Sequence, residues 1–299
     1  MKKLLFVSAI ILLHVANICA QVVSSSKATV LINNKPDATV NKSVPVAVES
    51  VIPATIATAA ALPVGTGKYY ALIIGINDYP DPDINSLDFC IRDAQSFYNA
   101  LTSFYTFEPG NVKFLKNATM SDIVNSLDYF AKIVKPTDSF LIFYAGHGVW
   151  NANSETGFWL PSDARKNSTL NWFRNSALRD YLREVNSKHT LLVTDACFGG
   201  SIFKTRAAFS DADLAVNKLY ELPSRKAMTS GTLTEVPDQS AFLKYMIERL
   251  NGNKEKYLSS EQLFSSFRIA VINNSNVIPQ YGEIKDVGDE GGDFIFIHR

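Results

Sequence analysis

The sequence predicts an α/β fold, a three-layer sandwich with a mostly parallel sheet of about six strands flanked by helices. Short apolar runs typical of fully buried strands lie at residues 69–76, 140–145 and 190–195. Between them, apolar residues recur at steps of three and four, as in amphipathic helices. This alternation of buried strands and helices is typical of a parallel sheet that helices cover on both faces.

The first half of the folded part alternates regularly. A strand at 69–76 precedes a helix whose apolar residues recur over 87–101. A second strand, at 111–115, precedes a helix that Thr119 is placed to cap. The strand at 140–145 completes this half, so three parallel strands and two helices are expected here.

The second half is less regular. Residues 149–161 are expected to form a loop or hairpin, and residues 202–223 show no period and are expected to be irregular. The other predicted elements are helices at 170–185, 240–250 and 260–272 and strands at 190–195, 225–231 and 294–297, the last of them closing the fold.

The composition limits the classes of partner. The chain has 299 residues, of which 46% are hydrophobic, enough for a sizeable core in one or two domains. Lys and Arg together number 29, as do Asp and Glu, so the formal net charge is zero. Without a basic excess we expect neither nucleic acid nor an anionic membrane surface as a partner.

Residues 1–20 have the form of a secretory signal peptide. Two lysines precede an apolar stretch at 4–18, and Ala20 offers a cleavage site. The stretch is shorter than the ~20 residues of a spanning helix, which disfavours an uncleaved anchor. Lipid attachment at Cys19 is also disfavoured, because the two residues before it are not small. We expect a secreted or periplasmic protein without a membrane attachment after cleavage.

Residues 21–68 predict a flexible leader or pro-segment. They are rich in Ala, Val, Ser, Thr and Pro, contain no aromatic residue and show no amphipathic period. Such a segment has little with which to anchor a core. The folded domain is therefore expected over residues 69–299.

Two predicted strands lead to residues with catalytic chemistry. His147 follows the strand at 140–145, and Cys197 follows the strand at 190–195. Parallel strands end at the same edge of a sheet, so we expect the two side chains to meet there. An imidazole can deprotonate a thiol, and the thiolate attacks carbonyl carbons. The pattern predicts amide hydrolysis through a thioester on Cys197, with His147 as general base.

Backbone groups beside this pair suit the same chemistry. Gly148 has no side chain to block access to its N–H. Together with the N–H of Cys197, it is placed to form an oxyanion hole. A disulfide between Cys90 and Cys197 is the competing interpretation in an exported protein. We favour a core thiol at Cys90, because it falls within a helical pattern.

These residues resemble a known family. Residues 144–148 (Tyr-Ala-Gly-His-Gly) and 195–197 (Asp-Ala-Cys) look like the two catalytic motifs of the caspase and metacaspase superfamily of cysteine peptidases. The separation, 197 − 147 = 50, is similar to that in caspases. The likeness extends from about residue 69 to the end and is greatest to bacterial metacaspase-like proteins. It implies a caspase-like endopeptidase with a large-subunit-like part at 69–203 and a small-subunit-like part at 224–299.

The resemblance also implies a substrate preference. Asp195 stands where metacaspases have Asp and animal caspases have Gln, and Asp93 matches the second acid of metacaspases in a Cys-x-x-Asp-Ala pattern. Together they imply a pocket for Arg or Lys before the scissile bond. The alternatives are that Asp93 is a solvated helix residue paired with Arg92 and that Asp195 caps a turn.

Processing and cofactors follow from the same likeness. Self-cleavage after Lys204, Arg206 or Arg225 is implied, as in relatives that mature into two chains. The sequence itself requires no cofactor and no metal, although the resemblance makes calcium activation an expectation to test. The acidic residues at 289–293 lack the spacing of an EF-hand and are interpreted as a solvated turn.

Two other functions stay open. A catalytically inactive caspase-like module would bind a peptide or a protein partner, and a ligase would pass the same thioester to an amine. Two other histidines of the predicted folded domain, His189 and His298, lie away from the predicted edge and are expected to be structural or exposed. Nothing in the sequence indicates an oligomeric state.

Overall fold

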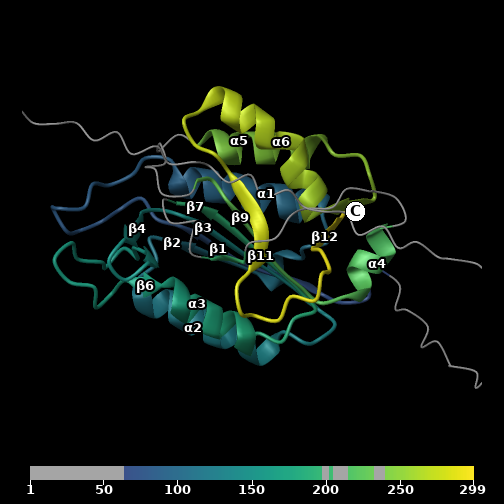
Figure 1. Cartoon of the computed structure of the whole chain (residues 1–299), viewed down its shortest axis with the longest axis horizontal. Coiled ribbons are helices and arrows are strands. Elements are labelled where there is room, and N and C mark those ends of the chain that lie inside the picture. Colours follow the sequence, from purple (N-terminus) through teal and green to yellow (C-terminus); the bar gives the residue numbers. More distant parts are fainter. Residues whose placement is uncertain (1–63, 197–201, 205–214, 232–239) are drawn as a thin grey trace, which may run out of the picture. The chain divides into compact units, whose positions relative to one another are not determined.

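The structure, a computed structural model, describes residues 64–196, 202–204, 215–231 and 240–299 (Figure 1). The predicted signal peptide, nearly all of the predicted leader, Cys197 and Arg206 lie outside these residues. None of the helices in the described ranges combines the length and the hydropathy that crossing a membrane requires.

The described residues form a seven-stranded sheet with the order β2-β1-β3-β7-β9-β11-β8. The first five strands are parallel, β11 runs antiparallel to β9, and β8 runs antiparallel to β11. Their bounds are β1 Tyr69–Gly75, β2 Val112–Lys116, β3 Ser139–Ala145, β7 His189–Asp195, β8 Phe203–Lys204, β9 Ser224–Thr229 and β11 Gln280–Ile284. The predicted α/β class with a mostly parallel sheet is confirmed.

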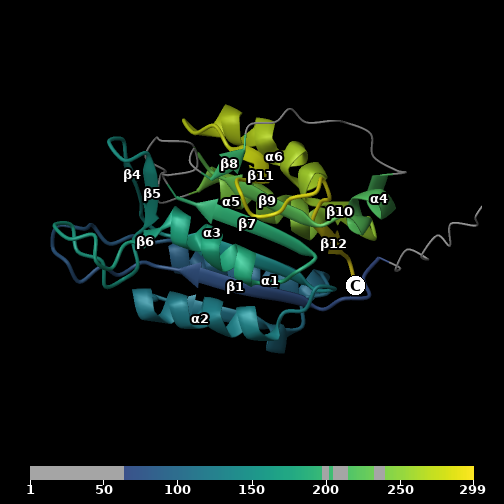
Figure 2. The ribbon, with the colours of Figure 1, turned by 60° about the horizontal axis from the view of Figure 1, so that its bottom comes forward.

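Helices cover both faces of this sheet (Figures 1 and 2). Every residue of β1, β3 and β7 is buried, and alternate side chains enter two separate cores. One core contains α1, α5 and α6, and the other contains α2 and α3. The helices are α1 Cys90–Phe104, α2 Met120–Ile133, α3 Asn175–Glu184, α4 Ala215–Glu221, α5 Ala241–Gly252 and α6 Ser260–Asn274, with a 3-10 turn, η1, at Pro109–Asn111.

The predicted cap of α2 is present. The Thr119 hydroxyl accepts the backbone N–H of Asp122, and the Asp122 carboxylate accepts the backbone N–H of Thr119. This reciprocal arrangement satisfies two backbone donors that the first turn of a helix leaves unpaired. It fixes where α2 begins, directly after the edge strand β2.

A small antiparallel sheet lies beyond the carboxyl ends of β1 and β7 (Figure 2). It consists of β4 (Gly148–Asn151), β5 (Thr156–Trp159) and β6 (Phe173–Arg174). The first two strands are the predicted hairpin. The third shortens the helix expected at 170–185, because residues 173–174 pair with β5 before α3 begins.

Other expectations are wrong in detail. Residues 202–223 are not irregular throughout, since they contain β8 and α4. The strand predicted at 294–297 is present as β12 (Ile295–Ile297), which pairs with β10 (Tyr257–Ser259) in a separate sheet. Residues 280–284 form β11, a strand that was not predicted, and only Ile284 of it is fully buried. A partly exposed strand needs no continuous apolar run, so the sequence gives it no clear signal.

The acidic segment at 289–293 is not solvated throughout: Glu290 is exposed, but Asp289 and Asp293 are not. Asp289 accepts a hydrogen bond from the Lys226 ammonium at 3.1 Å, and its side chain is only 5% exposed. Asp293 is buried and accepts a hydrogen bond from the Tyr281 hydroxyl at 2.8 Å. The two carboxylates tie this segment to β9 and β11, and a cation or a hydroxyl compensates each for the loss of water.

His189 gives the fold a testable dependence on pH. It is fully buried on β7, and burial lowers the pKa of its imidazole to about 3. Below about pH 6.5 the unfolded chain binds a proton on this imidazole, whereas the folded chain does not until about pH 3. The free energy of unfolding therefore decreases as the pH is lowered from about 6.5 to about 3. Denaturant unfolding should show a shallower decline in His189→Phe than in the wild type. Identical slopes would contradict this assignment.

Candidate active site

His147 lies where β3 passes into the small sheet. Residue 145 ends β3, and Gly148 begins β4. The imidazole Nε2 lies 2.7 Å from the backbone carbonyl oxygen of Asn85, in the loop that follows β1. A carbonyl only accepts hydrogen bonds, so this contact requires a proton on Nε2. In the neutral ring Nδ1 then carries the lone pair, and it is the nitrogen that can act as a base.

The strand register brings the two predicted catalytic segments to one row of the sheet. Ala145 of β3 faces Asp195 of β7 in the parallel ladder. His147 lies two residues beyond Ala145, and Cys197 lies two residues beyond Asp195. Neighbouring strands are about 5 Å apart. The segments that lead to His147 and to Cys197 therefore leave the sheet from neighbouring positions. Cys197 itself lies outside the described residues.

The Gly148 backbone N–H is not used by the β4–β5 ladder. Gly148 faces Trp159, and the Leu160 N–H donates to the His147 carbonyl at 3.0 Å. This hydrogen bond makes Gly148 and Trp159 a non-hydrogen-bonded pair, in which the Gly148 N–H points away from β5. The predicted oxyanion-hole donor is therefore not consumed by this pairing.

Asp93 and Asp195 belong to the same side of the sheet. Alternation along β7 places Asp195 on the face that α1 covers, and Asp93 lies in the first turn of α1. Asp195 is 9% exposed. Gly75 lies in the same row, two strands away, and α1 approaches it so closely that a Cβ would lie 2.9 Å from the Cys90 carbonyl oxygen. This close approach brings the start of α1 over the row.

The Asp93 carboxylate binds a guanidinium group within its own helix. Arg92 donates to Asp93 Oδ1 from Nη2 at 2.9 Å and from Nε at 3.1 Å, and the Asp93 side chain is 16% exposed. The ion pair between Asp93 and Arg92, which is the alternative to a substrate pocket at Asp93, is thus present. A partly exposed carboxylate of this kind is also suited to a basic substrate side chain, for which Arg92 would have to move.

The predicted processing residues lie in different environments. Lys204 is in the two-residue strand β8, and Arg206 lies outside the described residues. Arg225 is 8% exposed in β9, where its guanidinium donates to three backbone carbonyls, including that of Ser187 at 2.8 Å. A peptide bond inside a central strand cannot enter an active site of the same fold. Arg225 is therefore unsuited to processing in the folded chain.

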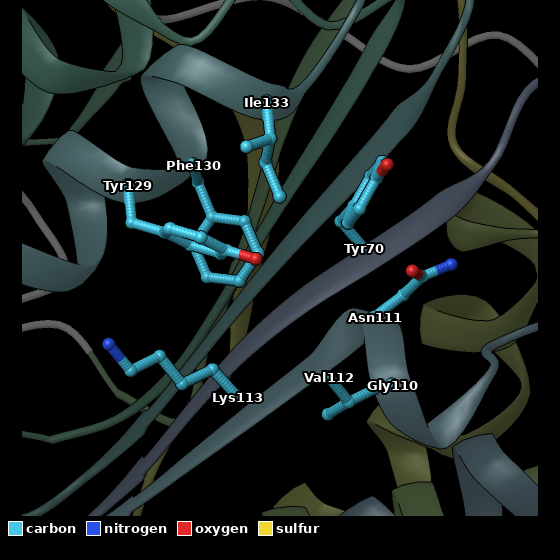
Figure 3. A pocket seen from close by; sticks show the side chains of 8 residues that line it. All are labelled: Tyr70, Gly110, Asn111, Val112, Lys113, Tyr129, Phe130 and Ile133. Carbon is cyan, nitrogen blue, oxygen red and sulfur yellow. The ribbon is translucent and has the colours of Figure 1, made fainter.

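A metal site in the described residues would require several ligating side chains close together. Across the described ranges, no three side chains of His, Cys, Asp or Glu gather as ligands would. A cavity of about 280 Å³ lies elsewhere, between β2 and α2, and Tyr70, Lys113 and Tyr129 are among the residues that line it (Figure 3). Tyr70 is near the start of β1, at the end of the sheet away from His147. The cavity is therefore separate from the candidate site.

Sequence reasoning missed two groups that contact the His147 imidazole ring. One is the Asn85 carbonyl, which gives no signal because every residue carries this group. The other is Tyr79, whose ring centroid lies 4.9 Å from that of the imidazole. Tyr79 lies in a loop rich in Pro and Asp, and such a loop is expected to be exposed. The sequence therefore gives no signal that the Tyr79 side chain is buried, with only 6% exposed.

Comparisons with known proteins give the family. A family model described as Caspase domain matches residues 68–282. Metacaspase-1 of Saccharomyces cerevisiae is 32% identical over 91 residues, which cover 28% of this chain and 21% of that protein. Metacaspase-1 of Candida glabrata is 31% identical over 91 residues, covering 28% and 23%. The match thus spans less than a quarter of each of these two relatives, and the expected closeness to bacterial members stays a prediction.

A solved structure supports the same fold. The crystal structure of protein GSU0716 from Geobacter sulfurreducens matches 76% of this chain and 99% of that one, with a TM-score of 0.52 and 16% sequence identity. At this identity the likeness concerns the fold alone. The family model spans residues 68–282 of a 299-residue chain and includes the segments of both predicted catalytic residues. The chain therefore belongs to the caspase-domain family of cysteine peptidases.

Proposed function

We propose that this chain is an exported cysteine endopeptidase that cleaves peptide bonds after Arg or Lys. One observation carries the proposal. The Asn85 carbonyl holds the His147 imidazole by Nε2 at the end of β3, next to the strand that leads to Cys197. This arrangement supports a base that faces a thiol across two adjacent strands.

The reaction would proceed in two stages. His147 Nδ1 takes the proton of the Cys197 thiol, and the thiolate attacks the carbonyl carbon of the scissile bond. The N–H groups of Gly148 and Cys197 bind the oxygen that becomes negatively charged. His147 then protonates the leaving amine, which releases the first product and leaves a thioester on Cys197. Water activated by the same imidazole hydrolyses the thioester.

The Asn85 carbonyl has a defined part in this scheme. It keeps the Nε2 proton in place while Nδ1 gains and loses the transferred proton. The same carbonyl still accepts the Nε2 proton in the imidazolium that forms after the first transfer, so the ring keeps its orientation. A backbone group does this without introducing a second negative charge beside the thiolate.

The preference for basic residues rests on Asp93 and Asp195. Both lie on the α1 face at the carboxyl end of the sheet, and Asp93 already binds one guanidinium, that of Arg92. Arg is suited to such a site because its planar fork matches a carboxylate. An acidic pocket would attract Arg or Lys and repel Asp, the residue that animal caspases select.

Export, self-processing and calcium activation belong to the same proposal. Export rests on residues 1–20, and self-cleavage is proposed after Lys204 or Arg206. Calcium activation rests on the family resemblance alone, and no step above passes through a metal. Ligation and binding without catalysis are the outcomes that would replace peptidase activity.

Cleavage of fluorogenic peptides tests the reaction. Peptides with Arg or Lys before the reporter should be cleaved and those with Asp should not, with and without calcium as parallel arms. Cys197→Ala should abolish cleavage, because no other group of the proposed site can form the thioester. Mass analysis of the products distinguishes hydrolysis from ligation. If the wild type cleaves no peptide and a thiol-reactive peptide does not label Cys197, the chain is a binding module.

Charge removal tests the pocket. Asp93→Asn and Asp195→Asn should each lower kcat/KM for Arg peptides at least about 30-fold, since losing one partner of a desolvated charge pair costs about 2 kcal/mol or more. Asp180→Asn is a control, because the Asp180 side chain is exposed on α3, where it pairs with Arg183, and this variant should keep the wild-type value. Equal losses in all three variants would argue against an acidic pocket.

A further inference from the structure

We propose that Tyr79 is a positioning residue for His147 and acts as one unit with Tyr144. The proposal rests on the proposed function, because it concerns how the general base is held. Its basis is a set of contacts around the backbone and ring of His147. None of these contacts involves the thiol or the substrate.

Tyr79 binds His147 at two places. Its hydroxyl accepts the backbone N–H of His147 at 3.0 Å and donates to the Leu160 carbonyl at 3.2 Å. Its ring packs against the imidazole, with centroids 4.9 Å apart and planes tilted by 51°. The side chain is 6% exposed, so it has little freedom to leave this position. One residue thus restrains both the backbone and the ring of the general base.

Tyr144 holds the other backbone group. Its hydroxyl donates to the His147 carbonyl at 2.7 Å, and its ring stacks on Trp159 with centroids 4.3 Å apart. Burial raises the pKa of both the Tyr79 and the Tyr144 hydroxyls, so both keep their protons at neutral pH. The N–H and the carbonyl of His147 are therefore each bound by a buried hydroxyl.

Gly146 shows how closely these hydroxyls approach the chain. A Cβ at this position would lie 2.8 Å from the Tyr144 hydroxyl oxygen and 3.1 Å from that of Tyr79. The first distance is shorter than real Cβ contacts and the second is tight, so a side chain here would displace at least the Tyr144 hydroxyl. Glycine before His147 is thus required by the same pair that binds the His147 backbone.

The loop after β1 carries both Tyr79 and Asn85, and hydrogen bonds fix its base. Asn77 Oδ1 accepts the Ile91 N–H at 2.8 Å, and the Leu87 N–H donates to the Asn77 carbonyl at 2.8 Å. These two hydrogen bonds therefore join the end of the loop to its beginning at Asn77. It presents the Asn85 carbonyl to Nε2 and the Tyr79 hydroxyl to the backbone.

A second anchor joins this loop to β2. Asn117 follows β2 in the left-handed region, with φ at 50°. Its Oδ1 accepts the N–H groups of both Asn77 and Asp78, at 2.9 and 3.0 Å. The loop is held at both its base and its side, so Tyr79 can act as a fixed support for His147.

The support of His147 by Tyr79 is expected to affect kcat more than KM. A general base must stay aligned with the proton that it removes, and a small displacement lowers the rate steeply. Substrate binding depends on other groups of the proposed site. Removing the Tyr79 hydroxyl should therefore lower kcat and leave KM unchanged.

The kinetic test uses matched buried tyrosines. Tyr79→Phe should lower kcat about tenfold, at constant KM. Tyr69→Phe and Tyr105→Phe are controls, since those buried hydroxyls donate to the backbone carbonyls of Ile295 and Leu250, at 2.9 and 2.8 Å, and not to the His147 segment. They should lose stability but keep kcat. Tyr144→Phe should lower kcat as well, and the double variant should lose less than the product of the two single losses.

A spectroscopic test does not depend on activity. The imidazole ¹⁵N shifts of His147 should report the Nε2-protonated tautomer in the wild type and a larger share of the Nδ1-protonated tautomer in Tyr79→Phe. If Tyr79→Phe does not fold, Tyr144→Phe provides both readouts. An unchanged tautomer together with the kcat of the controls would overturn the proposal. Absence of cleavage by the wild type would instead refute the proposed function, and the tautomer measurement would still decide the role of Tyr79.

Discussion

The parallel register of β1, β3 and β7 is the constraint on which the site depends. Gly75, Ala145 and Asp195 occupy one row across the three strands. The loop that binds His147, the His147 segment itself and the segment of Cys197 all leave the sheet from that row. Side chains alternate between faces, so a shift of one residue in this register would exchange the faces of every side chain on a strand. Continuous burial of these strands makes such a shift costly.

The candidate base is held almost entirely by uncharged groups. A backbone carbonyl binds the ring, and two hydroxyls bind the backbone around it. This has an electrostatic consequence. A carboxylate next to the imidazole would orient it equally well but would oppose thiolate formation nearby, since like charges raise a thiol pKa. Neutral partners orient the ring without that penalty.

The structure separates the acidic residues by environment. Asp289 and Asp293 are buried and bound to groups of the protein, so they serve the fold. Asp93, whose side chain is 16% exposed, and Asp195, which is 9% exposed, lie at the carboxyl end of the sheet on the α1 face. The sequence shows four similar carboxylates, and only their places in the fold and their partners distinguish these two groups.

Several features could be predicted from the sequence alone. The buried strands, the helices between them and the cap at Thr119 follow from local patterns of apolar and polar residues, which depend on neighbours a few positions away. The same patterns predict His147 and Cys197 as candidate catalytic residues, because each follows a buried strand. Motif resemblance, which is also local, led to the family that the comparisons support.

Only the tertiary structure decided the features that depend on distant segments. Strand β11 is short and partly exposed, so it is recognised by its pairing with β9 and not by its composition. Arg225 looks like a basic residue in a cleavable stretch until the sheet encloses it. Tyr79 lies 68 residues from His147, and the Asn85 carbonyl lies 62 residues away. Contacts of this kind arise when the sheet assembles, and no local pattern of residues encodes them.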